Sequence, residues 1–266
     1  MRVVIQDDYE KMSDWAANYI AEKIRAHEAS GEERPFVLGL PTGSSPIGVY
    51  KRLAKMNQEG TLSFANVVTF NMDEYVGLPH EHDQSYWYFM HDNFFDHLVD
   101  MKPENINILN GMAEDPEAEC EAYEEKIKSY GGIDLFMGGI GCDGHLAFNE
   151  PYTSLTSRTG VRSLTTDTRI VNSRFFGYDP EKVPSKALSV GIGTVTDSKE
   201  VLVLISGHNK ATALAHVVEG GVSQKWTCSA LQMHNGAIIA CDEEACGELT
   251  VDTYKYFLDI EKDERL

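Results

Sequence analysis

Short apolar runs alternate with longer amphipathic segments along this chain. The apolar runs have the length of buried strands and lie at FVLGL (36–40), VVTF (67–70), IDLFMGG (133–139), ALSVGIG (187–193), EVLVLISG (200–207) and AIIAC (237–241). Helical periodicity marks the segments 8–29, 46–57, 84–96, 115–130, 208–219 and 250–262. Strands that alternate with helices predict a Rossmann-like α/β fold, with helices on both faces of a mostly parallel sheet.

The chain shows no internal boundary. It contains no repeat, no low-complexity tract and no linker rich in Pro, Gly or Ser. Residues 1–266 are therefore predicted to form a single domain. In sheets of this kind, ligands bind beyond the carboxyl ends of the strands, so the loops that follow strands are the places to search for function.

Net charge limits the class of partner. The formal net charge is −19 over 266 residues, and the sequence pI is about 4.8. Such an acidic chain is a poor match for nucleic acid or for an anionic membrane surface. It also repels small anions at long range, so a phosphate site has to be built locally from backbone amides and a few basic side chains.

The N-terminus and the cysteines indicate a cytoplasmic protein. The first residues, MRVVIQDDYEKMSDW, carry charge almost at once, and no stretch of about 18 apolar residues occurs in the chain. The five cysteines are widely spaced and form no CxxC pair. We therefore expect free thiols in a reducing compartment.

The loop GLPTGSSPIGVY (39–50) has the features of an anion site. Ser45 and Pro46 match an N-cap followed by proline at the first helical position, and the free N–H groups of a helix start attract anions. The hydroxyls of Thr42 and Ser44 add donors. An ordinary turn between strand and helix has the same pattern, and the lysine of a nucleotide P-loop is absent.

The loop TFNMDEYVG (69–77) places Asp73 and Glu74 directly after a strand. Adjacent carboxylates repel each other, which raises one pKa and suits a general base. A carboxylate that caps the next turn explains the same two residues equally well, so the sequence leaves both interpretations open.

The loop GIGCDGHLAFNEP (139–151) holds Asp143, His145 and Glu150 close together in sequence. A histidine between two carboxylates is held in one tautomer and made more basic, so acid–base chemistry fits this loop best. A structural histidine in a glycine-rich loop and a metal site made of the three residues are alternatives. The loop also matches G-x-G-x-x-G, but a dinucleotide site requires a helix directly after this motif, and no helical pattern follows. A nucleophilic pair of Cys142 and His145 would need a third residue to orient it, and none is evident.

Eight segments between Phe36 and Phe257 resemble the glucosamine-6-phosphate deaminase family. They are FVLGLPTGSSP, VVTFNMDEYVGL, SYWYFMHDNFFDH, NINILNG, LFMGGIGCDGHLAFNEP, SLTSRT, NSRFF and KALSVGIGT. The family is similar in fold to sugar-phosphate isomerases and 6-phosphogluconolactonases, and the blocks NMDEY and CDGHLAFNEP favour the deaminase. The resemblance implies reversible conversion of glucosamine 6-phosphate to fructose 6-phosphate and ammonia, with no metal and no organic cofactor.

The resemblance also implies roles for single residues. His145 moves a proton at the ring oxygen and opens the sugar ring, and Asp143 and Glu150 orient the imidazole. Asp73 then carries a proton between C-2 and C-1, and water hydrolyses the resulting imine. The residues that match the phosphate site of the family are Thr42, Gly43, Ser44, Ser45, Arg174 and Lys210.

Residues 160–187 resemble the mobile lid that covers the active site in this family. Many bacterial members are activated by N-acetylglucosamine 6-phosphate, which binds between subunits. The positions that match their effector site are Thr153, Gly160, Arg162, Ser163 and Tyr256. Because Gly160 replaces an arginine that grips the effector phosphate, we expect weak or no activation. Many relatives are hexamers and others are monomers, so the resemblance is compatible with a homo-oligomer or a monomer.

Two other functions share this architecture. A hydrolase similar to 6-phosphogluconolactonase would not need Asp73 as an enolisation base, and ammonia release from glucosamine 6-phosphate separates it from a deaminase. A non-catalytic sugar-phosphate sensor, similar to the effector domains of some bacterial repressors, would carry a DNA-binding helix pair and a basic face. The acidic composition argues against the sensor.

Overall fold

Seven parallel strands form the central sheet of the computed structural model, which describes residues 1–266. The strands are β1 (Arg2–Gln6), β2 (Phe36–Leu40), β3 (Val67–Asn71), β5 (Ile106–Asn107), β6 (Leu135–Gly139), β9 (Glu200–Ile205) and β10 (Ala237–Asp242). Their order across the sheet is β1-β10-β9-β6-β2-β3-β5, and every neighbouring pair is parallel. The prediction of a mostly parallel sheet is confirmed.

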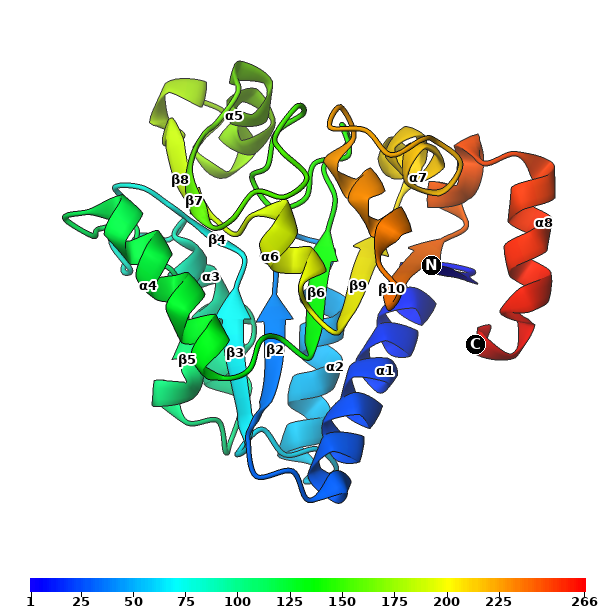
Figure 1. Ribbon diagram of the computed structural model, residues 1–266, viewed down its shortest axis with the longest axis horizontal. Coiled ribbons are helices and arrows are strands. Elements are labelled where there is room, and N and C mark those ends of the chain that lie inside the picture. Colours follow the sequence, from blue (N-terminus) through cyan, green and yellow to red (C-terminus); the bar gives the residue numbers. More distant parts are fainter.

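Helices cover both faces of this sheet and make three layers (Figure 1). One core contains α1 (Tyr9–Ser30), α2 (Ile47–Gln58) and α3 (Tyr86–Asn93), and the other contains α4 (Pro116–Ser129), α6 (Ile192–Thr196) and α7 (Ala211–Val218). Successive strand side chains point to opposite faces, so Val3 and Ile5 lie in one core and Val4 lies in the other. Burial on both faces explains why these strands are continuous apolar runs.

A second, smaller sheet lies near the carboxyl ends of the main strands. It is antiparallel, in the order β4-β8-β7, and consists of β4 (Asp73–Tyr75), β7 (Gly160–Ser163) and β8 (Lys186–Ser189). Helix α5 (Thr166–Asn172) lies between β7 and β8 in the chain and sits at the upper left of Figure 1. This unit has a small core of its own, made of Tyr75, Phe148, Leu164, Phe176, Val183 and Ala187.

The strand predicted at 187–193 is wrong in extent and in position. Only Lys186–Ser189 is extended, and it belongs to the small antiparallel sheet rather than to the main one. The chain then turns at Gly191, where the Ser157 carbonyl leaves no room for a side chain, and enters α6. The short strands β4, β5 and β7 and helix α5 were also not predicted, because two to seven residues carry little periodicity.

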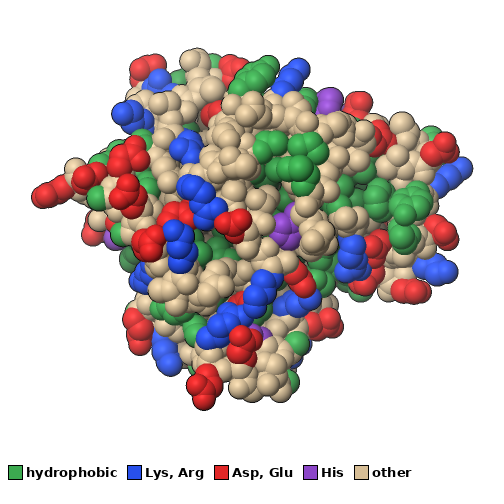
Figure 2. Space-filling view, in the orientation of Figure 1, with side chains coloured by type: hydrophobic (Ala, Val, Ile, Leu, Met, Phe, Trp, Pro, Cys, Tyr) green, Lys and Arg blue, Asp and Glu red, His purple; other side chains and the backbone are tan.

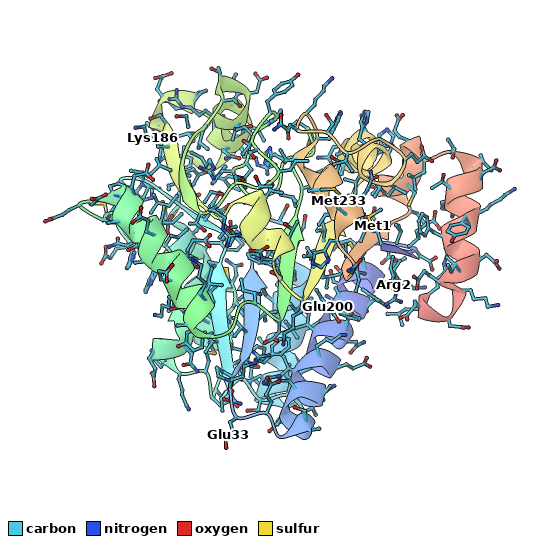
Figure 3. All side chains as sticks on the ribbon, in the orientation of Figure 1. Met1, Arg2, Glu33, Lys186, Glu200 and Met233 are labelled. Atoms are coloured by element: carbon cyan, nitrogen blue, oxygen red, sulfur yellow. The ribbon has the colours of Figure 1, made fainter.

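Strand β1 was missed because its stability comes from segments far away in sequence. It pairs with β10 on one side. Arg2, which is labelled in Figure 3, donates to Glu261 at 2.7 Å and to Glu264 at 2.9 Å. These two acidic residues lie at and beyond the end of α8 (Val251–Ile260). The C-terminal segment therefore covers this edge of the sheet, and no local sequence pattern predicts that contact.

The surface agrees with the composition. Asp and Glu side chains lie along the whole outline of the face in Figure 2, with Lys and Arg interspersed among them. All five cysteines are free, as predicted, and only Cys142 is exposed. No helix combines the length and the apolar character needed to cross a bilayer.

Candidate active site

The three loops singled out in the sequence leave neighbouring strands. Strands β6, β2 and β3 are adjacent in the sheet, and the loops that begin at residues 41, 72 and 140 all start at their carboxyl ends. After β2 the chain adds β3 and β5 toward one edge of the sheet, and after β6 it adds β9 and β10 toward the other edge. The strand order therefore reverses between β2 and β6, which makes their border a topological switch point. Ligands bind at such points in open α/β sheets.

Asp73 and Glu74 have different surroundings although they are adjacent. The carboxylate of Glu74 is fully buried and accepts hydrogen bonds from the N–H groups of Tyr75 at 2.8 Å and of Tyr86 and Trp87 at 2.9 Å. It therefore binds the first two N–H groups of α3, while the N-cap residue Ser85 binds the third. The carboxylate of Asp73 is 7% exposed and makes no hydrogen bond within the protein. The capping interpretation thus describes Glu74, whereas the carboxyl of Asp73 has no hydrogen-bond partner in the protein.

Burial raises the pKa of Asp73 to about 8, and the negative charge of Glu74 adds to this shift. Burial also raises the pKa of Glu74, but its three N–H partners stabilise the ionised form and oppose that shift. The backbone of Asp73 is held by pairing with Ser189 in β8, whose Oγ accepts a hydrogen bond from the N–H of Phe148 at 3.0 Å. The small sheet therefore holds Asp73 beside the 139–151 loop.

The 139–151 loop is folded back on itself by short-range hydrogen bonds. The N–H of Gly141 donates to the carbonyl of His145 at 2.9 Å, and Gly144 donates to Gly141 at 3.0 Å. Gly144 has φ +76, and a Cβ there would lie 2.6 Å from the Trp226 ring. Ala147 has φ 51, a left-handed conformation that is strained for a residue with a side chain. These constraints bring together side chains that are several residues apart.

His145 faces both carboxylates of the loop. Its Nδ1 lies 2.7 Å from Oδ1 of Asp143 and 4.0 Å from Oε2 of Glu150. The short contact to Asp143 does not have hydrogen-bond geometry, so Nδ1 of His145 is buried without a hydrogen-bond partner. Oε2 of Glu150 is also buried without one. Burial by itself would raise the pKa of Asp143, but interaction with His145 outweighs it and the pKa lies below its usual value. One carboxylate thus stays ionised beside the imidazole.

The same three residues also satisfy the distance requirement of a metal site. One ligand atom from each of Asp143, His145 and Glu150 lies within 4.8 Å of the others. The two buried atoms without partners could therefore be satisfied by a cation or by a proton that moves between them and a substrate.

Glu150 is held by the segment that the sequence predicts to be a lid. Its Oε1 accepts hydrogen bonds from Oγ1 of Thr168 at 2.6 Å and from the N–H of Thr165 at 3.2 Å. Thr165 is the N-cap of α5. Sequence reasoning missed both threonines, although Thr165 followed by Thr168 is a recognisable helix start. Residues 160–187 therefore contact one of the predicted catalytic carboxylates directly.

The 41–46 turn has free donors, although its predicted cap is wrong. Pro46 occupies the N-cap position of α2 with φ −81 and ψ −10, and Ser45 makes no capping hydrogen bond. The backbone N–H groups of residues 42–45 nevertheless donate to no atom of the protein, and Gly43 has φ +93. A run of unpaired N–H groups before a helix suits an anion.

The two predicted basic partners of the phosphate differ in position. Nζ of Lys210, which follows β9, donates to the carbonyl of Ile140 at 2.7 Å and so lies beside the 139–151 loop. Arg174 is exposed and lies over the ring of Phe175 at 4.6 Å. The structure thus places Lys210 at the 139–151 loop, whereas Arg174 lies on the 160–187 segment.

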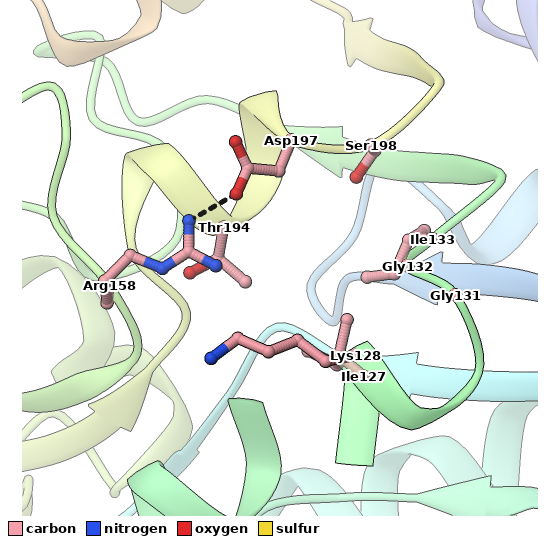
Figure 4. A pocket seen from close by; sticks show the side chains of 9 residues that line it. All are labelled: Ile127, Lys128, Gly131, Gly132, Ile133, Arg158, Thr194, Asp197 and Ser198. Atoms are coloured by element: carbon pink, nitrogen blue, oxygen red, sulfur yellow. Dashed lines mark hydrogen bonds and ion pairs between the residues drawn. The ribbon is translucent and has the colours of Figure 1, made fainter. Parts of the chain in front are cut away.

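A cavity of about 260 Å³ lies elsewhere (Figure 4). Its lining residues are Ile127, Lys128, Gly131, Gly132, Ile133, Arg158, Thr194, Asp197 and Ser198. They include residues that directly precede β6 and β9, so the cavity is at the amino ends of the strands. Arg158 and Asp197 form an ion pair there at 2.6 Å. The cavity is therefore at the opposite end of the sheet from the three loops.

Comparison with known proteins identifies the family. The family described as "Glucosamine-6-phosphate isomerases/6-phosphogluconolactonase" matches residues 7–240. The chain belongs to this family. It is 64% identical over 261 residues to a glucosamine-6-phosphate deaminase of Bacteroides thetaiotaomicron, covering 98% of this chain and 96% of that protein. It is 61% identical over 263 residues to one of Parabacteroides distasonis, covering 99% and 97%.

Solved structures of the glucosamine-6-phosphate isomerase/6-phosphogluconolactonase family agree with this assignment. A monomeric glucosamine-6-phosphate deaminase has a TM-score of 0.87 and 42% identity, with 93% of this chain and 100% of that chain covered. The 6-phosphogluconolactonase of Trypanosoma cruzi has a TM-score of 0.72 at 18% identity, with 94% and 97% covered. The second likeness establishes the shared fold alone.

The positions that match the effector site of this family do not form one site within the chain. Tyr256 is on α8, at the opposite edge of the molecule from β7, which carries Gly160 and Arg162 (Figure 1). A Cβ at Gly160 would lie 2.8 Å from Nη1 of Arg162. The guanidinium of Arg162 donates instead to Oδ1 of Asn149 at 3.2 Å. Thr153 lies before β7 in the chain, and Ser163 is the last residue of that strand.

Proposed function

We propose that this protein is a glucosamine-6-phosphate deaminase, which converts glucosamine 6-phosphate and water to fructose 6-phosphate and ammonia. One observation carries the proposal. The buried carboxyl of Asp73 makes no hydrogen bond in the protein, and it lies beside a loop in which His145 faces Asp143 and Glu150. Identity of more than 60% over nearly the full length to proteins of that name supports it. The hydrolase and sensor alternatives have no comparable support.

The proposed chemistry is a series of proton transfers. His145 accepts the proton of the C-1 hydroxyl and returns a proton to the ring oxygen, which opens the sugar to its aldehyde. Asp73 removes the C-2 proton, which gives an enolamine, and returns it to C-1, which gives a ketose imine. Water adds at C-2, and ammonia leaves. Asp143 and Glu150 keep the imidazole oriented for these transfers.

The phosphate and the lid complete the proposal. The N–H groups and hydroxyls of residues 42–45 would bind the phosphate, with Lys210 as a point charge. Arg174 would join them when the 160–187 segment closes, because it is carried on that segment. Closure would also carry Thr165 and Thr168, which hold Glu150. Residues 1–266 would act as one domain, in the cytoplasm and without a cofactor.

An ammonia-coupled assay on glucosamine 6-phosphate tests the proposal. We expect stoichiometric formation of ammonia and fructose 6-phosphate, and no loss of rate after prolonged treatment with a chelator. Hydrolysis of 6-phosphogluconolactone without ammonia release from glucosamine 6-phosphate would contradict the proposal. Loss of activity with a chelator, restored by a divalent cation, would favour the metal interpretation of the 139–151 loop.

Activation by N-acetylglucosamine 6-phosphate is expected to be weak or absent. The missing arginine at position 160 removes a charged hydrogen-bond partner, which costs on the order of 1.5–3 kcal/mol of effector binding. The rate should depend hyperbolically on substrate, and added effector should leave the curve unchanged. A sigmoidal curve that the effector makes hyperbolic would contradict this prediction. The oligomeric state, measured by light scattering in the same buffer, shows whether a subunit interface is present.

A further inference from the structure

Tyr9 connects the first helix to the turn that precedes α2. Its hydroxyl accepts a hydrogen bond from the N–H of Gly48 at 2.8 Å and lies 3.2 Å from the carbonyl oxygens of both Ser44 and Ser45. A tyrosine hydroxyl has one donor and accepts as well, so both capacities are used at this position. No pattern in the sequence links these residues.

The turn needs this partner because its own residues do not cap α2. Pro46 is in the N-cap position and offers no side-chain oxygen, and no side chain of the turn caps the helix. The first N–H groups of a helix have no intrahelical acceptor. Tyr9 takes the role that Ser45 was predicted to have, from a different helix.

The starts of α1 and α2 are packed closely enough to restrict Tyr9. A Cβ at Gly48 would overlap with the Ser13 hydroxyl and lie 3.0 Å from the Tyr9 oxygen. Arg52 of α2 donates to Glu10 of α1 at 2.8 Å. Because Gly48 has no side chain, the two helices approach each other and the hydroxyl of Tyr9 reaches the turn.

The hydrogen bonds of Tyr9 also determine the direction of a free donor. In a trans peptide, the carbonyl and the N–H point to opposite sides. The carbonyl of Ser44 faces Tyr9, so the N–H of Ser45 in the same peptide faces away from it, and that N–H has no acceptor in the protein. The hydroxyl therefore holds one of the unpaired donors in a defined direction.

We propose that Tyr9 is a positioning residue for phosphate recognition, which holds the 42–45 turn so that its N–H groups face the phosphate of the substrate. The proposal rests on the proposed function, because it takes this turn as the phosphate site. Tyr9 does not touch the substrate, and it acts through the turn. Preorganised donors bind more tightly because less order has to be imposed on binding.

The substitution Tyr9→Phe tests this proposal because it removes only the hydroxyl. We expect the KM for glucosamine 6-phosphate and the Kd for inorganic phosphate to rise together by about threefold to tenfold, which is the effect of one hydrogen bond. The kcat should stay within about twofold, because Asp73 and His145 are unchanged. Steady-state kinetics and calorimetric titration with inorganic phosphate give the three constants.

Tyr19→Phe is the matched control. Tyr19 lies on the same helix, and its hydroxyl donates to Oε2 of Glu200 at 2.7 Å. Glu200 begins β9, at the amino ends of the strands, whereas the turn follows the carboxyl end of β2. Each variant removes one hydroxyl from α1 together with its hydrogen bonds, so both should lose some thermal stability. Only Tyr9→Phe should raise the KM and the Kd for phosphate. Equal increases in both variants would mean a general loosening of α1 and would overturn the proposal.

Other outcomes separate this inference from the proposed function. A KM and a phosphate Kd within about twofold of wild type in Tyr9→Phe would overturn the positioning role. If the wild-type protein releases no ammonia from glucosamine 6-phosphate, the proposed function fails, and the phosphate titration alone still decides the role of Tyr9. If the wild-type protein does not bind inorganic phosphate at millimolar concentration, the turn is not a phosphate site and this inference fails as well.

Discussion

Asp73→Asn is expected to lower kcat for ammonia release by roughly 10²–10⁴-fold, because a positioned general base contributes about that factor. The side chain is nearly isosteric and makes no hydrogen bond in the wild type, so the site should keep its shape. The Kd for inorganic phosphate should therefore remain unchanged. Steady-state kinetics and phosphate titration of the same preparation measure both quantities. A kcat within tenfold of wild type would show that another group is the base.

The same carboxyl predicts a pH dependence of activity. Burial raises the pKa of Asp73 to about 8, so the free enzyme at pH 7 holds this group mostly protonated. Because the base form is the active one, kcat/KM should increase with pH along a limb centred near that pKa. A limb centred near pH 4 would mean that Asp73 is already ionised in the free enzyme at pH 7. Its carboxyl would then be less buried than the structure indicates.

Asp73→Asn is also expected to stabilise the fold, and more so at high pH. The pKa of Asp73 is raised in the folded state, so its contribution to stability is fully present below its ordinary value near 4 and is lost as pH rises toward 8. An asparagine cannot ionise and avoids this loss, which amounts to a few kcal/mol because each tenfold change in proton affinity is worth about 1.4 kcal/mol. Thermal unfolding at pH 5 and pH 9 should show a larger gain of the variant over wild type at pH 9 than at pH 5.

Asp134→Asn is the matched control with the opposite sign. Burial alone would raise the pKa of Asp134, but hydrogen bonds from Arg34, Lys199 and the N–H of Val37 lower it to about 2. Its contribution to stability is present above its ordinary pKa and is lost as pH falls toward 2. This substitution should therefore destabilise the protein at pH 7, and its kcat should match wild type at temperatures where it is folded.

Gly141→Ala is the second change with a large expected effect. A Cβ at Gly141 would lie 2.5 Å from Nδ1 of His145 and 2.6 Å from Oδ1 of Asp143. Both are side-chain atoms, so the imidazole and the carboxylate should move aside while the backbone holds. Misplacing a catalytic group by about 1 Å can cost on the order of 100-fold, so we expect kcat to fall by at least that factor. The thermal unfolding temperature should change only slightly.

Gly139→Ala is the control for this substitution. Gly139 ends β6, directly before the loop, and a Cβ there would have its nearest neighbour, the Leu204 carbonyl, at 3.8 Å. It should retain wild-type kcat. Loss of activity in both variants would indicate damage to the strand rather than displacement of His145. Retained activity in Gly141→Ala would show that His145 does not need its observed position.

Local patterns predicted most of the long elements of this fold. Helices α1, α2 and α4 lie within one residue of their predicted bounds, because amphipathic periodicity and Gly or Pro punctuation are encoded in adjacent residues. The five main strands predicted from apolar runs are also present. Such runs are distinctive here because a strand covered on both faces needs apolar side chains at every position.

The sequence predicted which residue types make up the site, whereas the surroundings of each residue became known only from the tertiary structure. The sequence placed Asp73, His145, Asp143 and Glu150 in strand-end loops, and a family resemblance suggested their roles. It could not show that Glu74 binds the first N–H groups of α3 while the carboxyl of Asp73 makes no hydrogen bond, because that depends on where the N–H groups of Tyr86 and Trp87 lie. It also could not show that Thr165 and Thr168 hold Glu150.

The sequence by itself thus determined the helices, the buried strands and the reactive loops, since each depends on residues within a few positions of one another. Only the tertiary structure decided the strand order, which brings the loops of β6, β2 and β3 together, and the small sheet that holds Asp73. It also decided which helix caps α2, where Tyr9 replaces Ser45. These features depend on contacts between residues distant in sequence, where free energy comes from packing and hydrogen bonds that no local pattern encodes.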